Sequence, residues 1–174
     1  MSTDFDPGPL ADASVVPEDG RWALIFVRDL RHPPAKVWAA LTNPEQLDQW
    51  APFTTPRDLA TIGDTTLTVI DGPNRTDMPA TVRRAEPPKF LEYTWGDDLL
   101  RWELTPTEQG TRLTLRHTFA KRDEAPMFLA GWHLCTAVLT HLLAGNPVGV
   151  IRGRDAMSYG WDDLRARYTE KLAT

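Results

Sequence analysis

The sequence is poor in cysteine and has no excess of positive charge. Its one cysteine, Cys135, cannot form an internal disulfide, and among apolar neighbours a lone thiol acts as a small hydrophobic side chain. Lysine and arginine number 19 against 24 aspartates and glutamates, which gives a net charge of -5. This balance argues against a general surface for nucleic acid or an anionic membrane. We therefore expect neither as a partner.

Long apolar runs are also missing. No run approaches the ~18 residues that cross a bilayer, and the first residues, MSTDFDPGPLADAS, are acidic where a secretory signal is basic and then apolar. These features predict a cytoplasmic protein without a membrane partner. Residues 1–20 combine prolines, glycines and aspartates with little apolar periodicity, which predicts a flexible tail. Residues 21–174 have the size of a single domain.

The usual signatures of several enzyme classes are absent. The sequence has no G-x-S-x-G, no phosphate-binding loop and no Rossmann glycine pattern. Its four histidines are scattered, and His133 and His141 lie eight residues apart instead of the four that place two ligands on one helical face. We expect no metal and no cofactor. Asp97 and Asp98 are adjacent, which favours a solvated hairpin turn over a pair of catalytic carboxylates.

The stretch Ala125–Gly145 predicts a long amphipathic helix. Apolar residues recur along it at steps of three and four, which place them on one face. That face needs a partner to cover it. Seven tryptophans in one small domain indicate either a wide core or a chamber with aromatic walls. The apolar stripe consists of Phe128, Trp132, Cys135, Leu139 and Leu142.

Most of the remaining chain reads as β-strands. Arg21–Leu30 predicts a first strand, and two short helices follow it, one beginning at Pro34 and one spanning residues 44–50. Turn signals between Asp58 and Phe119 separate five further strands, whose short connections favour an antiparallel meander. A final helix is expected from about Ser158.

This order of elements is accompanied by specific sequence words. They are PPAKVWAALTNPEQLDQW at the first helices, RRAEPPKFLEYTW in the sheet, ELTPTEQGTRLTLRH at the last hairpin and GWHLCTAVLTHLLAG in the long helix. Together they resemble the START-like SRPBCC superfamily, and within it the homologues of heat-shock-protein ATPase activators. The resemblance spans about residues 21–172. It implies an α+β helix-grip fold, in which a curved antiparallel sheet of about six to seven strands wraps around the long C-terminal helix and encloses an apolar cavity.

Strand alternation and the helix stripe place seven side chains on the expected cavity wall. His117 is the ionisable residue among apolar ones on its strand face, so it either binds a ligand, acts as an acid or base, or is a core histidine satisfied by a local partner. The aromatic rings either contact a ligand or pack the core. The seven candidates are Trp50, Tyr93, Trp95, Trp102, His117, Phe128 and Trp132.

The function that these features favour is binding of a small hydrophobic or aromatic molecule between the sheet and the long helix. One alternative is an enzyme, cyclase- or aromatase-like or a hydrolase, that acts on a cyclic apolar substrate with His117 as its catalytic residue. Another is a cochaperone-like protein-binding module, but a chaperone ATPase is disfavoured because the chain carries no companion N-terminal domain. We favour the non-enzymatic function, and a homodimer is compatible with the sequence.

Overall fold

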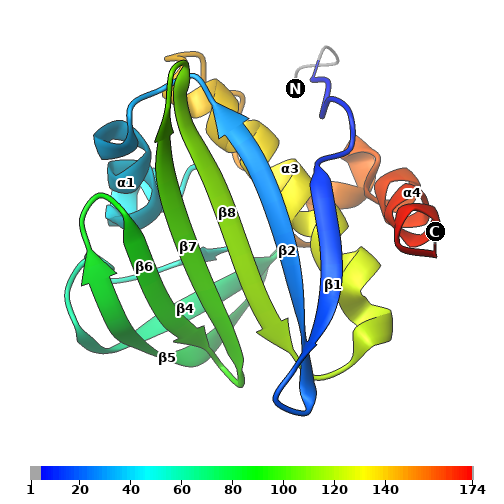
Figure 1. The fold of residues 1–174 in the computed structure, drawn as a ribbon, viewed down its shortest axis with the longest axis horizontal. Helices are drawn as coiled ribbons and strands as arrows, with labels where there is room; N and C mark the ends of the chain where they lie inside the picture. The colour runs from blue at the N-terminus through cyan, green and yellow to red at the C-terminus, as the bar shows by residue number, and fades with distance from the viewer. Residues whose placement is uncertain (1–4, 174) are drawn as a thin grey trace.

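A curved antiparallel sheet wraps around one long helix in the computed structural model, which describes residues 5–173 (Figure 1). The sheet has eight strands in the order β1-β2-β8-β7-β6-β5-β4-β3, and every neighbouring pair is antiparallel. The strands are β1 (Asp12–Glu18), β2 (Arg21–Leu30), β3 (Phe53–Thr54), β4 (Gly63–Asp71), β5 (Asn74–Glu86), β6 (Phe90–Trp95), β7 (Asp98–Thr107) and β8 (Gly110–Phe119).

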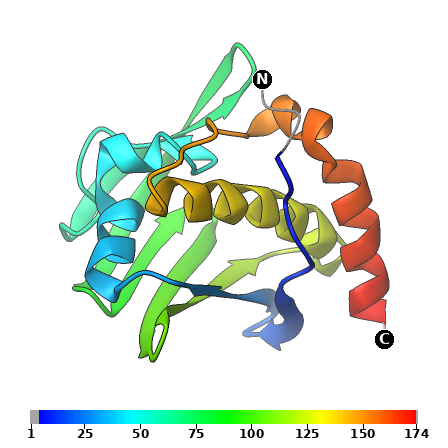
Figure 2. The same ribbon diagram turned by 90° about the horizontal axis from the view of Figure 1, so that it is seen from above.

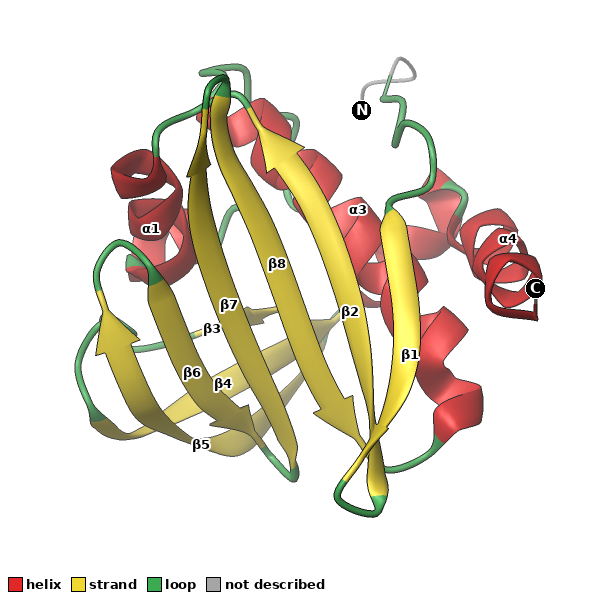
Figure 3. Cartoon of the chain, in the orientation of Figure 1, coloured by secondary structure: helices red, strands yellow, loops and turns green. Residues whose placement is uncertain are grey.

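The helices lie on the concave side of this sheet and at its ends (Figure 3). Two short ones follow β2, as the sequence predicts, and the long helix follows β8. They are α1 (Pro34–Thr42), α2 (Pro44–Leu47), the 3-10 turn η1 (Arg122–Glu124), α3 (Ala125–Leu143), the 3-10 segment η2 (Gly153–Tyr159) and α4 (Trp161–Ala173).

The structure confirms the predicted fold class and adds strands to it. The five strands expected between Asp58 and Phe119 are β4 to β8, and the expected first strand is β2. The sheet nevertheless has eight strands instead of six or seven, because a strand precedes β2 and the two-residue β3 pairs with β4.

The prediction of a flexible tail over residues 1–20 is wrong for Asp12–Glu18, which form the edge strand β1. This strand pairs with β2 along its whole length. Asp19 and Gly20, both with positive φ, form the tight turn between them, as an Asp-Gly pair favours. Pro17 is tolerated because an edge strand has one side without a partner strand. Residues 1–4 of the predicted tail lie outside the described part of the chain.

The two short helices are set by their first residues. Pro34 occupies the first turn of α1, where a missing backbone N–H costs no helical hydrogen bond. Asn43 ends α1 and caps α2, because its side-chain oxygen accepts hydrogen bonds from the backbone N–H groups of Glu45 and Gln46. Together α1 and α2 cover one end of the sheet's concave face.

Helix α3 is covered on both sides, and not only along its predicted apolar stripe. The sheet lies against one side, while the segment before β1, η2 and α4 lie against the other (Figure 2). By length and a mean hydropathy of 1.3, Arg122–Leu143 could cross a membrane, but 61% of that apolar window is buried inside the fold. The apolar character of this segment is therefore accounted for by its place in the core.

Candidate functional site

Aromatic rings fill the space between the sheet and α3. Trp102 on β7 packs edge-on against Trp50 from the segment after α2 and against Trp132 on α3, with ring centroids 6.0 and 5.4 Å apart. Trp132 also meets the ring of Trp95 at the end of β6. Such edge-to-face contacts are favourable beyond the apolar area that they bury. The interior is thus a continuous cluster of rings, not a wide empty chamber.

A small apolar pocket of about 110 Å³ remains at one end of this cluster, between α3 and η2. One of its lining residues, Met127, is 37% exposed, so the pocket reaches the surface beside this side chain. Its walls are formed by Pro52, Trp95, Met127, Phe128, Gly131, Trp132, Leu134, Cys135, Ile151, Arg152, Gly153 and Ala156.

A second depression of about 300 Å³ shares two of these wall residues. Trp95 and Phe128 line both spaces, and the outer one is completed by side chains of β4, β5 and the β6–β7 turn, including Asp98. Both rings are only partly buried. The inner apolar pocket and this outer, partly polar depression therefore adjoin at the two aromatic side chains.

The structure brings all seven predicted site residues into the same aromatic core but divides them into two groups. Trp95, Phe128 and Trp132 line the inner pocket. The other four lie behind these rings, away from the pocket, and all are buried. Those four are Trp50, Tyr93, Trp102 and His117.

Two of these deeper residues have their polar atoms satisfied by the protein itself. The indole N–H of Trp50 donates to the carbonyl oxygen of Ala40 at 2.8 Å, and that of Trp102 donates to the hydroxyl oxygen of Tyr93 at 3.1 Å. Burial raises the pKa of Tyr93 far above its usual value, so its hydroxyl stays neutral. These contacts fix ring positions in the core.

His117 is fully buried and hydrogen-bonded through both ring nitrogens. The Trp132 indole N–H lies 3.1 Å from His117 Nδ1, and Asp98 Oδ2 lies 2.8 Å from Nε2. An indole N–H can only donate, so Nδ1 accepts and the proton of the neutral ring sits on Nε2, from which it is donated to Asp98. Burial lowers the pKa of His117, although Asp98 acts in the opposite direction. The ring is therefore neutral in a fixed tautomer.

The prediction of a solvated hairpin turn at Asp97 and Asp98 holds for Asp97 but is wrong in part for Asp98. The hairpin turn is present between β6 and β7, and Asp97 is exposed. Asp98 is not simply solvated, because its carboxylate joins buried His117 to Arg21 on β2, whose Nη2 lies 3.3 Å from Oδ1. The sequence does not predict this contact, because adjacency in a turn does not determine which of two side chains points inward.

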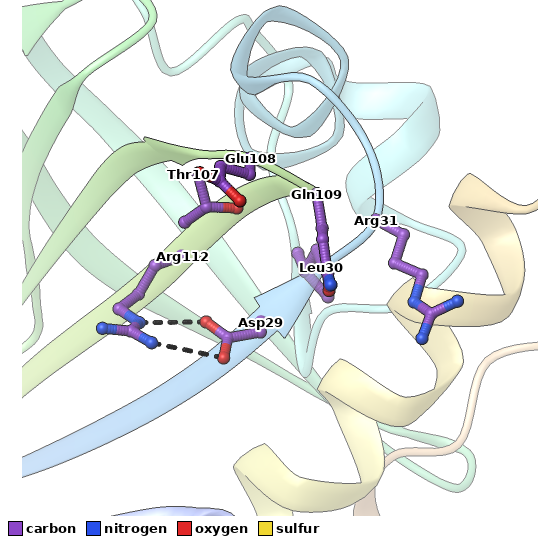
Figure 4. A pocket seen from close by; sticks show the side chains of 7 residues that line it. All are labelled: Asp29, Leu30, Arg31, Thr107, Glu108, Gln109 and Arg112. Atoms are coloured by element: carbon purple, nitrogen blue, oxygen red, sulfur yellow. Dashed lines mark hydrogen bonds and ion pairs between the residues drawn. The ribbon is translucent and has the colours of Figure 1, made fainter.

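The other surface features give less support for a functional site. A depression of about 500 Å³ at the β7–β8 turn is lined by the buried Leu30 and otherwise by polar, exposed side chains, among them the ion pair of Asp29 with Arg112 (Figure 4). Within residues 5–173, no group of three or more potential metal-ligating side chains is present. Three surface arginines form ion pairs, Arg84 with Glu86, Arg116 with Glu18 and Arg154 with Asp71. Arg152, whose side chain is only 11% exposed, pairs with Asp48.

A sheet that grips a long C-terminal helix over an aromatic core with a small apolar pocket defines a helix-grip, START-like protein. Residues 31–144 match the family described as Activator of Hsp90 ATPase homolog 1-like protein, and the chain belongs to that family. No curated protein matches the sequence.

Solved structures agree on the fold along most of the chain. The solution structure of CalU16 from Micromonospora echinospora has a TM-score of 0.70 at 16% identity, covering 99% of this chain and 96% of that one. A conserved protein of unknown function from Enterococcus faecalis has a TM-score of 0.66 at 17% identity, covering 92% and 90%. A protein from Rhodobacter sphaeroides reaches 24% identity with a TM-score of 0.61, covering 75% and 97%. At these identities the likeness concerns the fold alone.

Proposed function

We propose that the protein binds a small hydrophobic or aromatic molecule in the pocket between α3 and η2. The observation that carries this proposal is the apolar pocket itself, walled by the rings of Trp95, Phe128 and Trp132 and reached past Met127. Rigid aromatic walls favour flat apolar ligands, because they offer contact area and few rotamers that must be fixed on binding.

The volume sets the size of the ligand. About 110 Å³ is well below the ~300–1,000 Å³ typical of drug-sized ligands and close to the ~150 Å³ of an engineered cavity that holds benzene. A ligand of one aromatic ring therefore fits the inner pocket. A larger one has to displace the Trp95 and Phe128 side chains and extend into the outer depression of about 300 Å³.

The glycine at position 131 supports the proposal that the pocket binds a ligand. It lies in the middle of α3, where a glycine costs ~1 kcal/mol relative to alanine. A β-carbon added at this position would meet no atom within 4 Å, so no close neighbour requires the missing side chain. The glycine therefore lowers the stability of α3 without relieving a close contact, and the space beside it is open to a ligand.

The enzyme alternative gains no support from the site. For His117 to act as an acid or base, one ring nitrogen has to face a substrate. Nδ1 accepts a hydrogen bond from Trp132 and Nε2 donates one to Asp98, so neither is free. His117 is accounted for as a satisfied core histidine.

The test is a titration with aromatic probes of increasing size, indole and then naphthalene derivatives, followed by tryptophan fluorescence and by NMR chemical-shift changes. Wild type is expected to bind the one-ring and two-ring probes saturably. Gly131→Leu is expected to abolish binding of the smaller probe, because the added side chain occupies the pocket while leaving the core residues in place.

The matched control is Thr140→Leu, which adds the same side chain at an exposed position of α3 outside the pocket. It should bind like wild type. If Gly131→Leu, folded by circular dichroism, binds the probes as tightly as Thr140→Leu, the pocket is not their site and the proposal fails.

A further inference from the structure

Arg28 is a partly buried cation on the inward face of the sheet. Along β2 it lies at steps of two from the buried residues Leu24, Phe26 and Leu30 and so shares their face, which turns its side chain toward α3 instead of toward solvent. Its Nε donates to Thr136 Oγ1 on α3 at 3.3 Å, and the guanidinium lies 5.4 Å from the centre of the Phe26 ring. The charged group thus sits between the sheet and the helix.

This cation has no counterion in the part of the chain that the structure describes. No carboxylate forms an ion pair with Arg28, and its Nη2 is buried without a hydrogen-bond acceptor among residues 5–173. Burial lowers the pKa of the guanidinium. Taking an arginine out of water without pairing it costs free energy, so such groups are normally compensated.

Between Phe5 and Ala173, the surroundings of Arg28 do not supply negative charge either. Its neighbours in the interior are the neutral pair of His133 and Tyr168, whose ring nitrogen and hydroxyl oxygen lie 2.7 Å apart. The positive charge of Arg28 acts on the pKa values of both residues. Arg167 on α4 also influences them, but it lies 3.8 Å from the carboxylate of Asp163 and is itself paired. Among the described residues, Arg28 is therefore the uncompensated charge of this region.

We propose that Arg28 binds the carboxylate of a small anionic molecule between β2 and α3. The residue as a whole is only partly buried, but Nη2 itself is buried, so an anion has to displace the side chains that cover Nη2 to bind it. One unpaired guanidinium edge matches one singly charged oxyanion through charge-assisted hydrogen bonds. A phosphate dianion would call for a second free cation, which Arg167 does not provide. This site is separate from the apolar pocket, whose wall does not include Arg28.

The experiment measures thermal unfolding and calorimetric binding with benzoate, its neutral analogue benzamide, and inorganic phosphate as probes. Wild type is expected to bind benzoate saturably with a rise in unfolding midpoint, and to respond weakly or not at all to the other two. Arg28→Met should lose this response, with affinity for benzoate weaker by at least about tenfold. Arg28→Lys, which keeps the charge but not the fork of donors, should retain part of it.

Two controls separate binding from a structural effect. Arg112→Met removes an exposed arginine of β8 and should leave the benzoate response unchanged. Without added anion, Arg28→Met should be at least as resistant to urea as wild type, because it removes an uncompensated charge. Indole binding at the apolar pocket should be the same in Arg28→Met, so failure of either site is recognised independently.

The proposal is overturned by any of three results: benzoate that binds Arg28→Met as well as wild type, an equal response to benzamide, or a stronger response to phosphate than to benzoate. If wild type binds no carboxylate and Arg28→Met is clearly less stable than wild type, the proposal fails and Arg28 is a structural residue whose guanidinium is hydrated.

Discussion

Asp98 Oδ2 accepts a hydrogen bond from His117 Nε2 at 2.8 Å, so a carboxylate in a surface turn holds a fully buried imidazole. Arg21 on β2 pairs with the same carboxylate, and Trp132 on α3 completes the chain on the other side of the ring. One line of polar contacts therefore runs from the sheet surface to the core helix.

Replacing Asp98 by alanine is expected to destabilise the protein by ~1–3 kcal/mol, because the buried His117 N–H loses its acceptor. Asp98→Asn should cost less, since an amide oxygen can still accept that hydrogen bond. Urea unfolding gives the free energies. Asp97→Asn is the control, because Asp97 is exposed and its side chain should contribute within about 0.5 kcal/mol. Equal stability of Asp98→Ala and wild type would mean that water replaces the carboxylate at no cost.

A second buried histidine predicts loss of stability at mildly acidic pH. His133 Nδ1 lies 2.7 Å from the Tyr168 hydroxyl and Nε2 lies 2.8 Å from the Pro7 carbonyl oxygen, which fastens the segment before β1 to α3 and α4. Burial, followed by the charge of Arg28, lowers the pKa of His133 from 6.5 to about 4. The unfolded chain therefore binds a proton first as the pH falls.

The free energy of unfolding should accordingly be constant above pH 6.5 with respect to His133 and decline between pH 6.5 and about 4. Urea unfolding across this range gives the slope. His133→Phe should be less stable at neutral pH but show a shallower decline. The remaining slope is expected to include buried His117, whose pKa is also lowered, so His133→Phe must be compared with the same variant carrying His117→Phe. An unchanged slope in both would contradict the assignment.

Periodic patterns account for the parts of the fold that the sequence predicts. Strand β2, the five strands β4 to β8 and helix α3 each bury a regular set of residues, and that regularity is visible in the sequence. Strand β1 lacks such a signal, because it pairs on one side and buries little. Its strongest mark was the Asp19-Gly20 turn, which predicts a hairpin regardless of the strand's composition.

The candidate sites show the same limit at the level of side chains. Alternation correctly placed Tyr93, Trp102 and His117 inside, but whether a ring lines a pocket or fills the core depends on how neighbouring rings pack. The two-residue spacing of Arg28 from Phe26 and Leu24 predicts its inward position, because residues two apart on a strand share a face. The lack of a counterion for Arg28 among residues 5–173 could not be predicted, because it depends on residues distant in sequence.

Cys135 is expected to be unreactive in the folded protein. Its thiol is buried, and burial raises its pKa to about 12, so almost none of the reactive thiolate is present at neutral pH. A colorimetric disulfide reagent should label it only slowly under native conditions and rapidly in urea. Because Cys135 lines the apolar pocket, Gly131→Leu should slow native labelling further. Fast native labelling would show that the pocket opens readily enough to expose the thiol.

Two glycines predict opposite results for the same substitution. Gly131→Ala should stabilise the protein by ~1 kcal/mol, because alanine favours a helix interior and its β-carbon meets no atom within 4 Å. Gly110 begins β8 with φ +152, and a β-carbon there would lie 2.5 Å from the His32 backbone nitrogen and closer still to the Leu30 carbonyl oxygen. Gly110→Ala should therefore cost at least about 2 kcal/mol through backbone strain and overlap. Urea unfolding of both variants measures this difference in stability.

The same Gly131→Ala variant also tests the role of the glycine in binding. If it is more stable than wild type and binds the one-ring probe more weakly, Gly131 keeps the pocket open at the expense of stability. If it is more stable and binds the probe as wild type does, Gly131 has no part in ligand binding.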